Sequence, residues 1–220
     1  MKIIGHRGAK GLAPENTLAS FRKAIEHNVD EIELDVRVSL DNVAIVQHDI
    51  RLCDPSGHCL DVSQTPYQTL LAHKPDLLTL EQALRAINKA VPVIVEVKPR
   101  VKTKPVVNVI TKLRATGWQD HDILLGSFSQ KTLVELHAAL PSVPKVVIES
   151  WSGIRATLRA RKLNTKRISM SKTWLWSGFI KRMEKRGYKV APYTINDVAK
   201  AKSLEKQGVY AVITDFPDRF

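Results

Sequence analysis

Short apolar runs alternate along the chain with longer segments in which apolar residues recur at helical spacing. Side chains of a strand alternate between two faces, whereas the apolar residues of a helix return every three or four positions, so the two patterns can be distinguished. The segments that predict strands are 2–5, 31–36, 93–98, 123–128, 145–149, 168–171, 189–194 and 210–214. The segments that predict helices are about 15–27, 79–90, 105–116, 130–140, 153–163, 174–187 and 196–207, the last with Asn196 as its N-cap.

This regular alternation indicates parallel strands that are joined by helical crossovers. Eight such strands close a (β/α)8 barrel, so we expect an α/β protein with one TIM-barrel domain over residues 1–220. An open doubly wound sheet is the alternative. That fold normally carries a GxGxxG phosphate turn after its first strand, and Gly8, Gly11 and the residues between them do not form one, so the barrel is favoured.

The second apolar run carries carboxylates on one face and is followed by a hairpin signal. Glu33 and Asp35 share a face, while the apolar residues of the run share the other. A turn at 40–42 precedes a further apolar run, so the returning arm should bring His48 and Asp49 beside Asp35. A solvated strand face is the alternative explanation of the two acids.

An insertion of about 36–78, which includes this hairpin, is expected after the second strand. Its 50–78 part has many turn residues and little periodicity, which predicts an irregular loop of the kind that often carries function. Cys53 and Cys59 lie in this part. A disulfide between them is sterically possible, but the absence of an export signal favours reduced thiols.

Composition is ordinary for a globular protein, with 44% hydrophobic and 25% charged residues. No apolar run approaches the roughly 20 residues that span a bilayer. No signal peptide is recognisable at the N-terminus. These features predict a cytoplasmic protein without stable membrane anchoring.

The net charge of +12 favours anionic substrates or partners. Solvated helix faces would account for the basic clusters, and a nucleic-acid or membrane-surface patch is the alternative. Aromatic residues interleave poorly with these charges, so we expect no nucleic-acid partner. The clusters comprise Arg155, Arg159, Arg161, Lys162, Lys166, Arg167, Lys181, Arg182, Lys185 and Arg186.

Acidic residues gather where predicted strands end, which is where the catalytic groups of TIM barrels lie. Glu33 and Asp35 end the second strand, and Glu96 ends the third. Three carboxylates without thiolates form a hard-oxygen site that suits Mg²⁺ or Ca²⁺ better than Zn²⁺. We therefore predict a divalent cation as cofactor.

Cations and imidazoles gather at the same strand ends. Arg7 and Lys98 can hold anionic oxygens. His6 and His48 can titrate near neutral pH and can serve as a general acid and base. Together with a metal, these groups fit the cleavage of a phosphodiester.

The motif series resembles that of the glycerophosphodiester phosphodiesterases. The resemblance implies a TIM barrel and the hydrolysis of small-molecule glycerophosphodiesters to glycerol 3-phosphate and an alcohol. It also implies a divalent cation on the three acidic residues, and the two histidines as the acid/base pair. The motifs are His6-Arg7-Gly8, Pro14-Glu15-Asn16-Thr17, Glu33-Leu34-Asp35-Val36, His48-Asp49, Glu96-Val97-Lys98, Ser127-Phe128, Tyr193-Thr194-Ile195-Asn196 and Thr214-Asp215-Phe216-Pro217.

Five further residues are candidates for supporting roles around this site, and we expect Asp215 to pair with Arg7 or Lys98. Two other functions stay open: lysophospholipase D activity, which needs an apolar groove near the 50–78 segment, and a basic binding protein without catalysis. The oligomeric state also stays open. The supporting candidates are Asn16, Asp49, Ser127, Tyr193 and Asp215.

Overall fold

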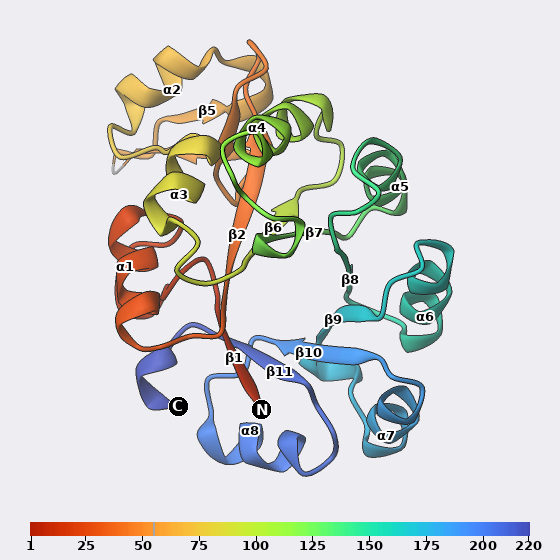
Figure 1. Ribbon diagram of the computed structural model, residues 1–220. Coiled ribbons are helices and arrows are strands. Elements are labelled where there is room, and N and C mark those ends of the chain that lie inside the picture. The colour runs from red at the N-terminus through yellow and green to blue at the C-terminus, as the bar shows by residue number, and fades with distance from the viewer. Residues whose placement is uncertain (55) are drawn as a thin grey trace.

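Eight strands form the inner ring of the computed structural model, which describes residues 1–54 and 56–220 (Figure 1). Their order around the ring is β10-β9-β8-β7-β6-β2-β1-β11, and neighbouring strands in this series pair in parallel. At the seam between β10 and β11, the Tyr210 amide donates to the Val190 carbonyl at 3.0 Å. The predicted (β/α)8 barrel is therefore confirmed. The strands are β1 (Lys2–Gly5), β2 (Glu31–Val38), β6 (Val93–Val97), β7 (Ile123–Ser127), β8 (Lys145–Glu149), β9 (Arg167–Ser171), β10 (Lys189–Tyr193) and β11 (Ala211–Thr214).

Helices surround the ring as an outer layer (Figure 1). Thr17 and Thr79 each form a capping box, and Asp197 rather than Asn196 caps the last long helix through the Lys200 amide at 2.8 Å. In the described part of the chain, no helix is both long and apolar enough to cross a bilayer. The outer helices are α1 (Leu18–Glu26), α3 (Leu80–Ile87), α4 (Lys104–Arg114), α5 (Gln130–Ala139), α6 (Gly153–Lys162), α7 (Ser177–Lys185) and α8 (Val198–Glu205).

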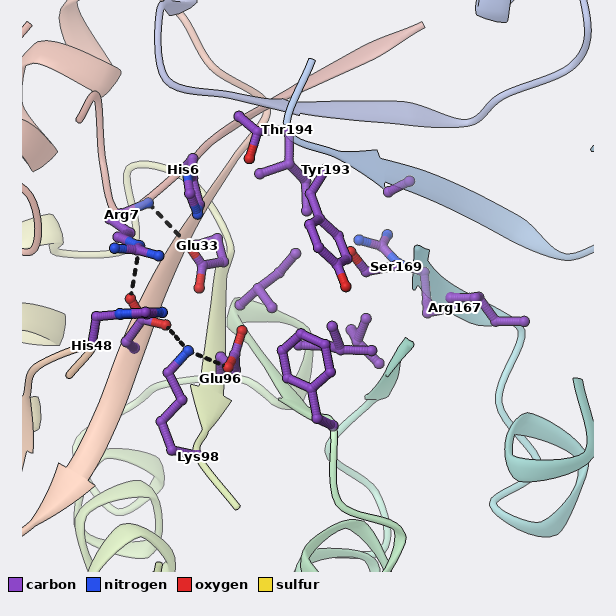
Figure 2. A pocket seen from close by; sticks show the side chains of 18 residues that line it. His6, Arg7, Glu33, His48, Glu96, Lys98, Arg167, Ser169, Tyr193 and Thr194 are labelled. Carbon is purple, nitrogen blue, oxygen red and sulfur yellow. Dashed lines mark hydrogen bonds and ion pairs between the residues drawn. The ribbon is translucent and has the colours of Figure 1, made fainter. Parts of the chain in front are cut away.

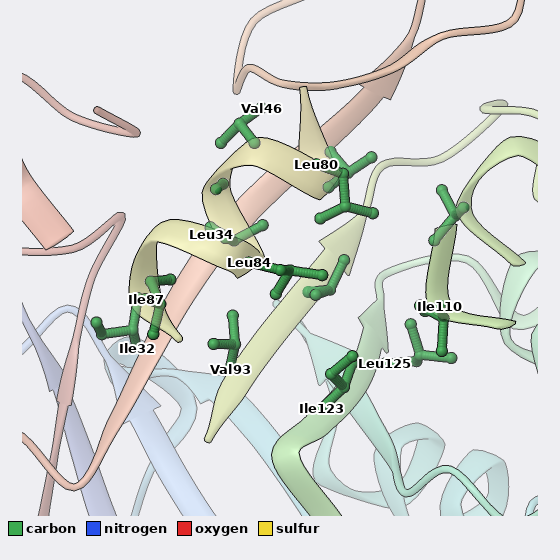
Figure 3. Packing of buried hydrophobic residues seen from close by; sticks show 14 of the residues in the cluster. Ile32, Leu34, Val46, Leu80, Leu84, Ile87, Val93, Ile110, Ile123 and Leu125 are labelled. Carbon is green, nitrogen blue, oxygen red and sulfur yellow. The ribbon is translucent and has the colours of Figure 1, made fainter. Parts of the chain in front are cut away.

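The main apolar core lies between the strands and these helices. Leu84 and Ile87 of α3 pack over β2 and β6, where they join Ile32, Leu34 and Val93 (Figure 3). Because strand side chains alternate, the acidic residues of β2 must then face the inside of the barrel. Burial of the apolar face therefore fixes the direction in which the carboxylates point.

The hairpin after the second strand forms as predicted. The strand β3 (Ala44–Val46) pairs antiparallel with β2, and Val36 lies opposite Val46. The prediction that 50–78 is irregular was wrong. This segment forms the paired strands β4 (Arg51–Cys53) and β5 (Cys59–Asp61), followed by the helix α2 (Tyr67–His73). These elements are too short for periodicity to identify them, and they enclose a small core of Ile45, Leu52, Val62, Leu70 and Leu77.

Cys53 and Cys59 are joined by a disulfide, which overturns the expectation of reduced thiols. The two residues lie directly opposite each other in the β4–β5 pair. This cross-strand register joins two strands of three residues each, which are too short to be recognised in the sequence. Next to the disulfide, ligand atoms of Asp54, His58 and His73 lie within 4.8 Å of one another.

Two arginines that were expected on solvated helix faces are instead paired inside the protein. Arg159 donates to the carbonyls of Ile148 at 2.9 Å and Ser127 at 3.1 Å, so it ties together the ends of β7 and β8. Arg167 begins β9 and pairs with Glu31 at 2.5 Å. A run of charges in the sequence does not show that one member starts a strand whose side chain points into the barrel.

We predict that Lys145 makes stability depend on pH. The residue is 2% exposed, and burial lowers the pKa of its amine to about 8. Between that pH and the ordinary lysine pKa of about 10.4, the folded protein binds fewer protons than the unfolded chain, so stability rises with pH. Denaturant unfolding measures this effect. Across this pH window, the free energy of unfolding of the wild type should increase relative to that of Lys145→Met.

Lys131→Met is the matched control, because Lys131 is exposed. The free energy of unfolding of this variant should change with pH as that of the wild type does. A difference between wild type and Lys145→Met that stays constant with pH would contradict the prediction.

Candidate active site

A cavity of about 180 Å³ opens where the barrel strands end. One side is polar and is lined by residues of β1, β2, β6 and the segments that follow them, including His6, Glu33 and Lys98 (Figure 2). The opposite side includes Tyr193 (Figure 2), which packs on the apolar lining residue Phe128. The cavity therefore offers charged groups on one side and an apolar wall on the other.

Three buried carboxylates meet on the polar side. Asp35 of β2 lies beside Glu96 of β6 in the parallel register, and Glu33 precedes Asp35 on the same face. The three side chains offer oxygens within 4.8 Å of one another, and the residues are 4%, 1% and 7% exposed in the order Glu33, Asp35, Glu96. The predicted convergence of these acids is present in the structure, and an all-oxygen set of this kind can hold a hard divalent cation.

Two cations contact the carboxylates. Lys98 Nζ lies 2.6 Å from Asp35 Oδ1 and also binds Glu96, while Arg7 Nε lies 3.2 Å from Asp35 Oδ2 (Figure 2). Burial opposes ionisation of Asp35, but Lys98 and Arg7 outweigh it and lower the pKa of this carboxyl. Arg7 also donates to both oxygens of Glu15 at 2.8 Å.

Glu33 is less well compensated. Its Oε2 accepts a hydrogen bond from the Arg7 amide at 3.0 Å. Burial, followed by the charges of Asp35 and Glu96, raises the pKa of Glu33 well above its ordinary value. With all three carboxyls ionised, the cluster carries more negative charge than Arg7 and Lys98 balance, and a bound cation would favour that ionised state.

The His6–Arg7–Gly8 turn has a shape that the sequence alone explains only in part. Arg7 and Gly8 have φ values of 50° and 85°. A Cβ on Gly8 would come within 2.5–2.8 Å of Ser20, whose hydroxyl donates to the Arg7 carbonyl at 2.9 Å. Glycine is therefore required where the turn passes the first turn of α1.

Both predicted histidines line the cavity (Figure 2). His6 Nδ1 lies 2.6 Å from Asp215 Oδ1, and Asn196 donates to the other oxygen of Asp215 at 2.9 Å. The expectation that Asp215 pairs with Arg7 or Lys98 was therefore wrong, because β1 and β11 are neighbours and their ends bring Asp215 to His6. His48 Nδ1 lies 2.8 Å from Asp49 Oδ1, and burial lowers the pKa of the His48 ring.

Residues 6–219 match the model of the "Glycerophosphoryl diester phosphodiesterase family". The chain belongs to this family of enzymes. A relative from Bacillus subtilis (strain 168), named glycerophosphodiester phosphodiesterase, is 27% identical, and the match covers 99% of this chain and 84% of that protein. The Bacillus subtilis protein YhdW is 29% identical over 99% of this chain and 96% of its own length.

Solved structures of the family share the fold. A phosphodiesterase from Oleispira antarctica, in complex with the product sn-glycerol-3-phosphate, superposes with a TM-score of 0.86 at 26% identity and covers 100% of this chain and 94% of that one. The glycerophosphodiester phosphodiesterase from Agrobacterium tumefaciens strain C58 has a TM-score of 0.82 at 23% identity, with coverages of 99% and 97%. This protein is therefore a phosphodiesterase of the glycerophosphoryl diester family, and it has the barrel fold of the family's solved structures.

The five supporting candidates of this family member take different positions. Asn16 Nδ2 donates to Asp35 Oδ2 at 3.0 Å and so holds a member of the acidic cluster. The Ser127 hydroxyl donates to the Val97 carbonyl at 2.6 Å and does not line the cavity. Tyr193 lines the cavity, packs edge-to-face on Phe128 and hydrogen-bonds Ser150 at 3.2 Å, and burial raises its pKa to about 12. Asp49 and Asp215 each contact a cavity histidine.

Four residues that hold or line the site had no role assigned from the sequence. Glu15 holds Arg7, and Asn196 holds Asp215. Both lie inside the quoted motifs, which was the available signal. Deeper in the cavity, Ser169 and Arg167 reach the lining, and the Ser169 hydroxyl has no hydrogen-bond partner among the described residues (Figure 2). Nothing in the local sequence separates these two from ordinary strand residues.

We predict that Lys98→Met destabilises the metal-free protein by about 3–5 kcal/mol at pH 7, because it leaves Asp35 and Glu96 buried without their nearest cation. Urea unfolding in EDTA measures the effect. Lys104→Met, which removes the same charge at the exposed start of α4, is the control and should change stability by less than about 0.5 kcal/mol. Equal effects of the two substitutions would refute the assigned role of Lys98.

Proposed function

We propose that this protein hydrolyses small-molecule glycerophosphodiesters to glycerol 3-phosphate and an alcohol with the help of a divalent cation. The observation that carries the proposal is the convergence of two histidines, three carboxylates and two cations in one cavity. Family membership supplies the substrate class. The relative from Oleispira antarctica, which was solved with sn-glycerol-3-phosphate, supports the proposed product.

The acidic cluster fits a divalent cation. Its ligands are oxygens, its charge exceeds that of its neighbours, and the pKa of Glu33 is raised because no adjacent cation fully offsets its burial. We assign Glu33, Asp35 and Glu96 as the ligands of Mg²⁺ or Ca²⁺. A cation at this position would polarise a phosphoryl oxygen and balance the charge that develops on it.

The chain's own residues supply proton transfer and further charge balance. His6 and His48 act as the general acid and base: one takes the proton of the attacking oxygen, and the other donates to the leaving alkoxide. Asp215 holds His6 through Nδ1 and so leaves its Nε2 for the substrate. Burial lowers the pKa of His48 and so favours its neutral ring, which suits a proton acceptor.

Arg7 and Lys98 lie beside the carboxylates and are the proposed phosphate-binding groups. Both are already held by carboxylates, Arg7 by Glu15 and Asp35 and Lys98 by Asp35 and Glu96. Fixed cations of this kind lose little entropy when an anionic oxygen arrives. They would orient the diester so that both histidines reach its phosphorus.

The lysophospholipase D alternative needs an apolar groove at the insertion, and the structure does not favour it. Leu70, which would contribute to such a groove, is fully buried in the insertion's own core. The apolar wall at the cavity itself consists of Phe128 and Tyr193 with aliphatic strand residues. This wall suits the carbon skeleton of a small glycerol moiety.

Incubation with glycerophosphocholine and either Mg²⁺ or Ca²⁺ tests the proposal. We expect release of glycerol 3-phosphate and choline, together with loss of activity in EDTA and recovery when the cation is restored. Absence of product with both cations, or product formation that EDTA leaves unchanged, would refute the proposed metal-assisted hydrolysis.

We predict that His48→Ala lowers kcat by about 10²–10⁴-fold, because it removes a proton-transfer group. Stopped assays with glycerophosphocholine measure kcat and KM. His121→Ala is the matched control, since that imidazole is 80% exposed and lies outside the cavity, and it should retain wild-type kcat. A His48→Ala enzyme with unchanged kcat would exclude the acid/base role.

A further inference from the structure

The positive charge of the protein is concentrated in one part of the chain. Residues 151–189 contain twelve lysines and arginines and a single acidic residue, Glu184, which gives a net charge of +11 out of +12 for the whole protein. The segment comprises α6, β9, α7 and the start of β10. In Figure 1, α6 and α7 lie next to each other on the outside of the barrel. Within this segment, Arg159 and Arg167 are paired inside the protein and Arg155 pairs with Glu149, and the other nine lysines and arginines are exposed.

Large apolar side chains are exposed on the same surface. Trp151, Ile154, Leu158 and Trp176 are 65%, 77%, 60% and 64% exposed. Ile154 and Leu158 are four residues apart and so lie on one side of α6. Exposed apolar residues that occur singly are normal, but a group of this size indicates an interaction surface.

A groove of about 610 Å³ runs between α6 and α7 and brings the two features together. Its lining includes Ile154 and Leu158 together with the guanidinium-bearing residues Arg161, Arg182 and Arg186. Among the described residues, none of these three arginines forms an ion pair with a carboxylate. We call the surface formed by Trp151, Ile154, Leu158, Arg161, Trp176, Arg182 and Arg186 the α6–α7 face.

We propose that the α6–α7 face docks reversibly on an anionic lipid bilayer. Side chains such as Ile154 and Trp176 would enter the interfacial region, where aliphatic and indole groups are favoured. Arg161 and Arg182 would contact anionic headgroups, which attract basic residues that lie close to the surface. Docking through a surface differs from the stable anchoring that the sequence argues against, because no spanning segment is required.

The chemistry of the face favours lipid over nucleic acid. Arginines alone would suit either polyanion, because both present phosphates. Ile154 and Leu158 favour lipid, because exposed aliphatic side chains on a helix form no favourable contact with a phosphate backbone. In a bilayer interface the same side chains leave water for an apolar environment.

Docking through this face would place the mouth of the barrel beside the membrane. Trp151 follows β8 by two residues, and Trp176 lies between β9 and α7, so both belong to loops at the end of the barrel where the cavity opens. Ser150, which precedes Trp151, hydrogen-bonds the cavity residue Tyr193 at 3.2 Å. The face and the candidate active site are therefore neighbours.

Co-sedimentation with lipid vesicles tests this proposal. We expect the wild-type protein to bind vesicles of phosphatidylcholine mixed with phosphatidylglycerol and to bind vesicles of phosphatidylcholine alone at least about tenfold more weakly, because two headgroup contacts at roughly 1 kcal/mol each already exceed that factor. Binding to the anionic vesicles should weaken as salt is added. Absence of binding to the anionic vesicles at low salt would overturn the proposal.

Two double variants separate the apolar from the charged contribution. Ile154→Gln with Leu158→Gln, and Arg161→Gln with Arg182→Gln, should each weaken binding to the anionic vesicles by roughly tenfold or more. Leu40→Gln with Val134→Gln is the control for lost exposed apolar groups, and Arg22→Gln with Lys206→Gln is the control for lost charge. Both controls should bind as the wild type does.

Parallel titration with double-stranded DNA tests the competing partner. The proposal fails, and the face is a nucleic-acid surface, if the following pattern is found. The wild type binds DNA at low salt, the Arg161/Arg182 variant binds DNA more weakly, the Ile154/Leu158 variant binds DNA as the wild type does, and none of these proteins binds vesicles. Turnover of soluble glycerophosphocholine is measured in the same preparations and should be unchanged in all four variants. Vesicle binding requires no turnover, so an inactive wild type would refute the proposed hydrolysis and leave the docking result intact.

Discussion

The structure depends on how it accommodates three carboxylates that are buried at one end of the barrel. Glu33, Asp35 and Glu96 are nearly inaccessible to solvent and their oxygens lie within 4.8 Å of one another. Desolvation and mutual repulsion both disfavour such a group unless cations lie against it. Lys98 and Arg7 lie against Asp35 and Lys98 against Glu96, whereas burial and the neighbouring carboxylates raise the pKa of Glu33 and so disfavour its ionised form. Such a cluster can hold a divalent cation, which is the role proposed for it above.

Backbone geometry forces this arrangement. Ile32 and Leu34 are fully buried under α3. Because side chains alternate along a strand, the neighbouring residues of β2 face the barrel interior. The parallel register then sets Asp35 beside Glu96. A shift of one residue in either strand would move the acids into the apolar core and Ile or Val side chains into the cavity, which makes any other register strongly unfavourable. The energy of the apolar layer therefore maintains an electrostatically costly site, and the same layer explains why the site can be pre-formed before any substrate arrives.

The features that could be predicted from the sequence are those that depend on residues close together along the chain. Alternation along β2 and the regular succession of helices placed Glu33 and Asp35 and predicted the barrel, because both patterns are local. The His6–Asp215 pair joins residues 209 positions apart. It depends on the pairing of β1 with β11, which no local sequence pattern reveals. Arg167 was grouped with surface charges because composition cannot reveal that it begins a strand. The disulfide was missed for a similar reason, since it depends on a hairpin of two strands with three residues each.

The two electrostatic features of this enzyme act over different distances. Inside the cavity, low solvent access lets carboxylates and cations interact strongly at contact distance. On the α6–α7 face, charges are solvated, and at physiological salt their field extends only about 8 Å. The net charge of +12 therefore cannot act on the cavity from the whole surface. It can act on whatever lies against the exposed lysines and arginines of residues 151–189, a segment whose first residue follows the cavity neighbour Ser150. Arg161, Lys162 and Lys185 lie in the last turns of α6 and α7, and barrel helices run opposite to the strands, so these charges lie toward the end of the barrel away from the cavity mouth. At this range they act on a partner that lies against the α6–α7 face rather than on a diester that enters the cavity.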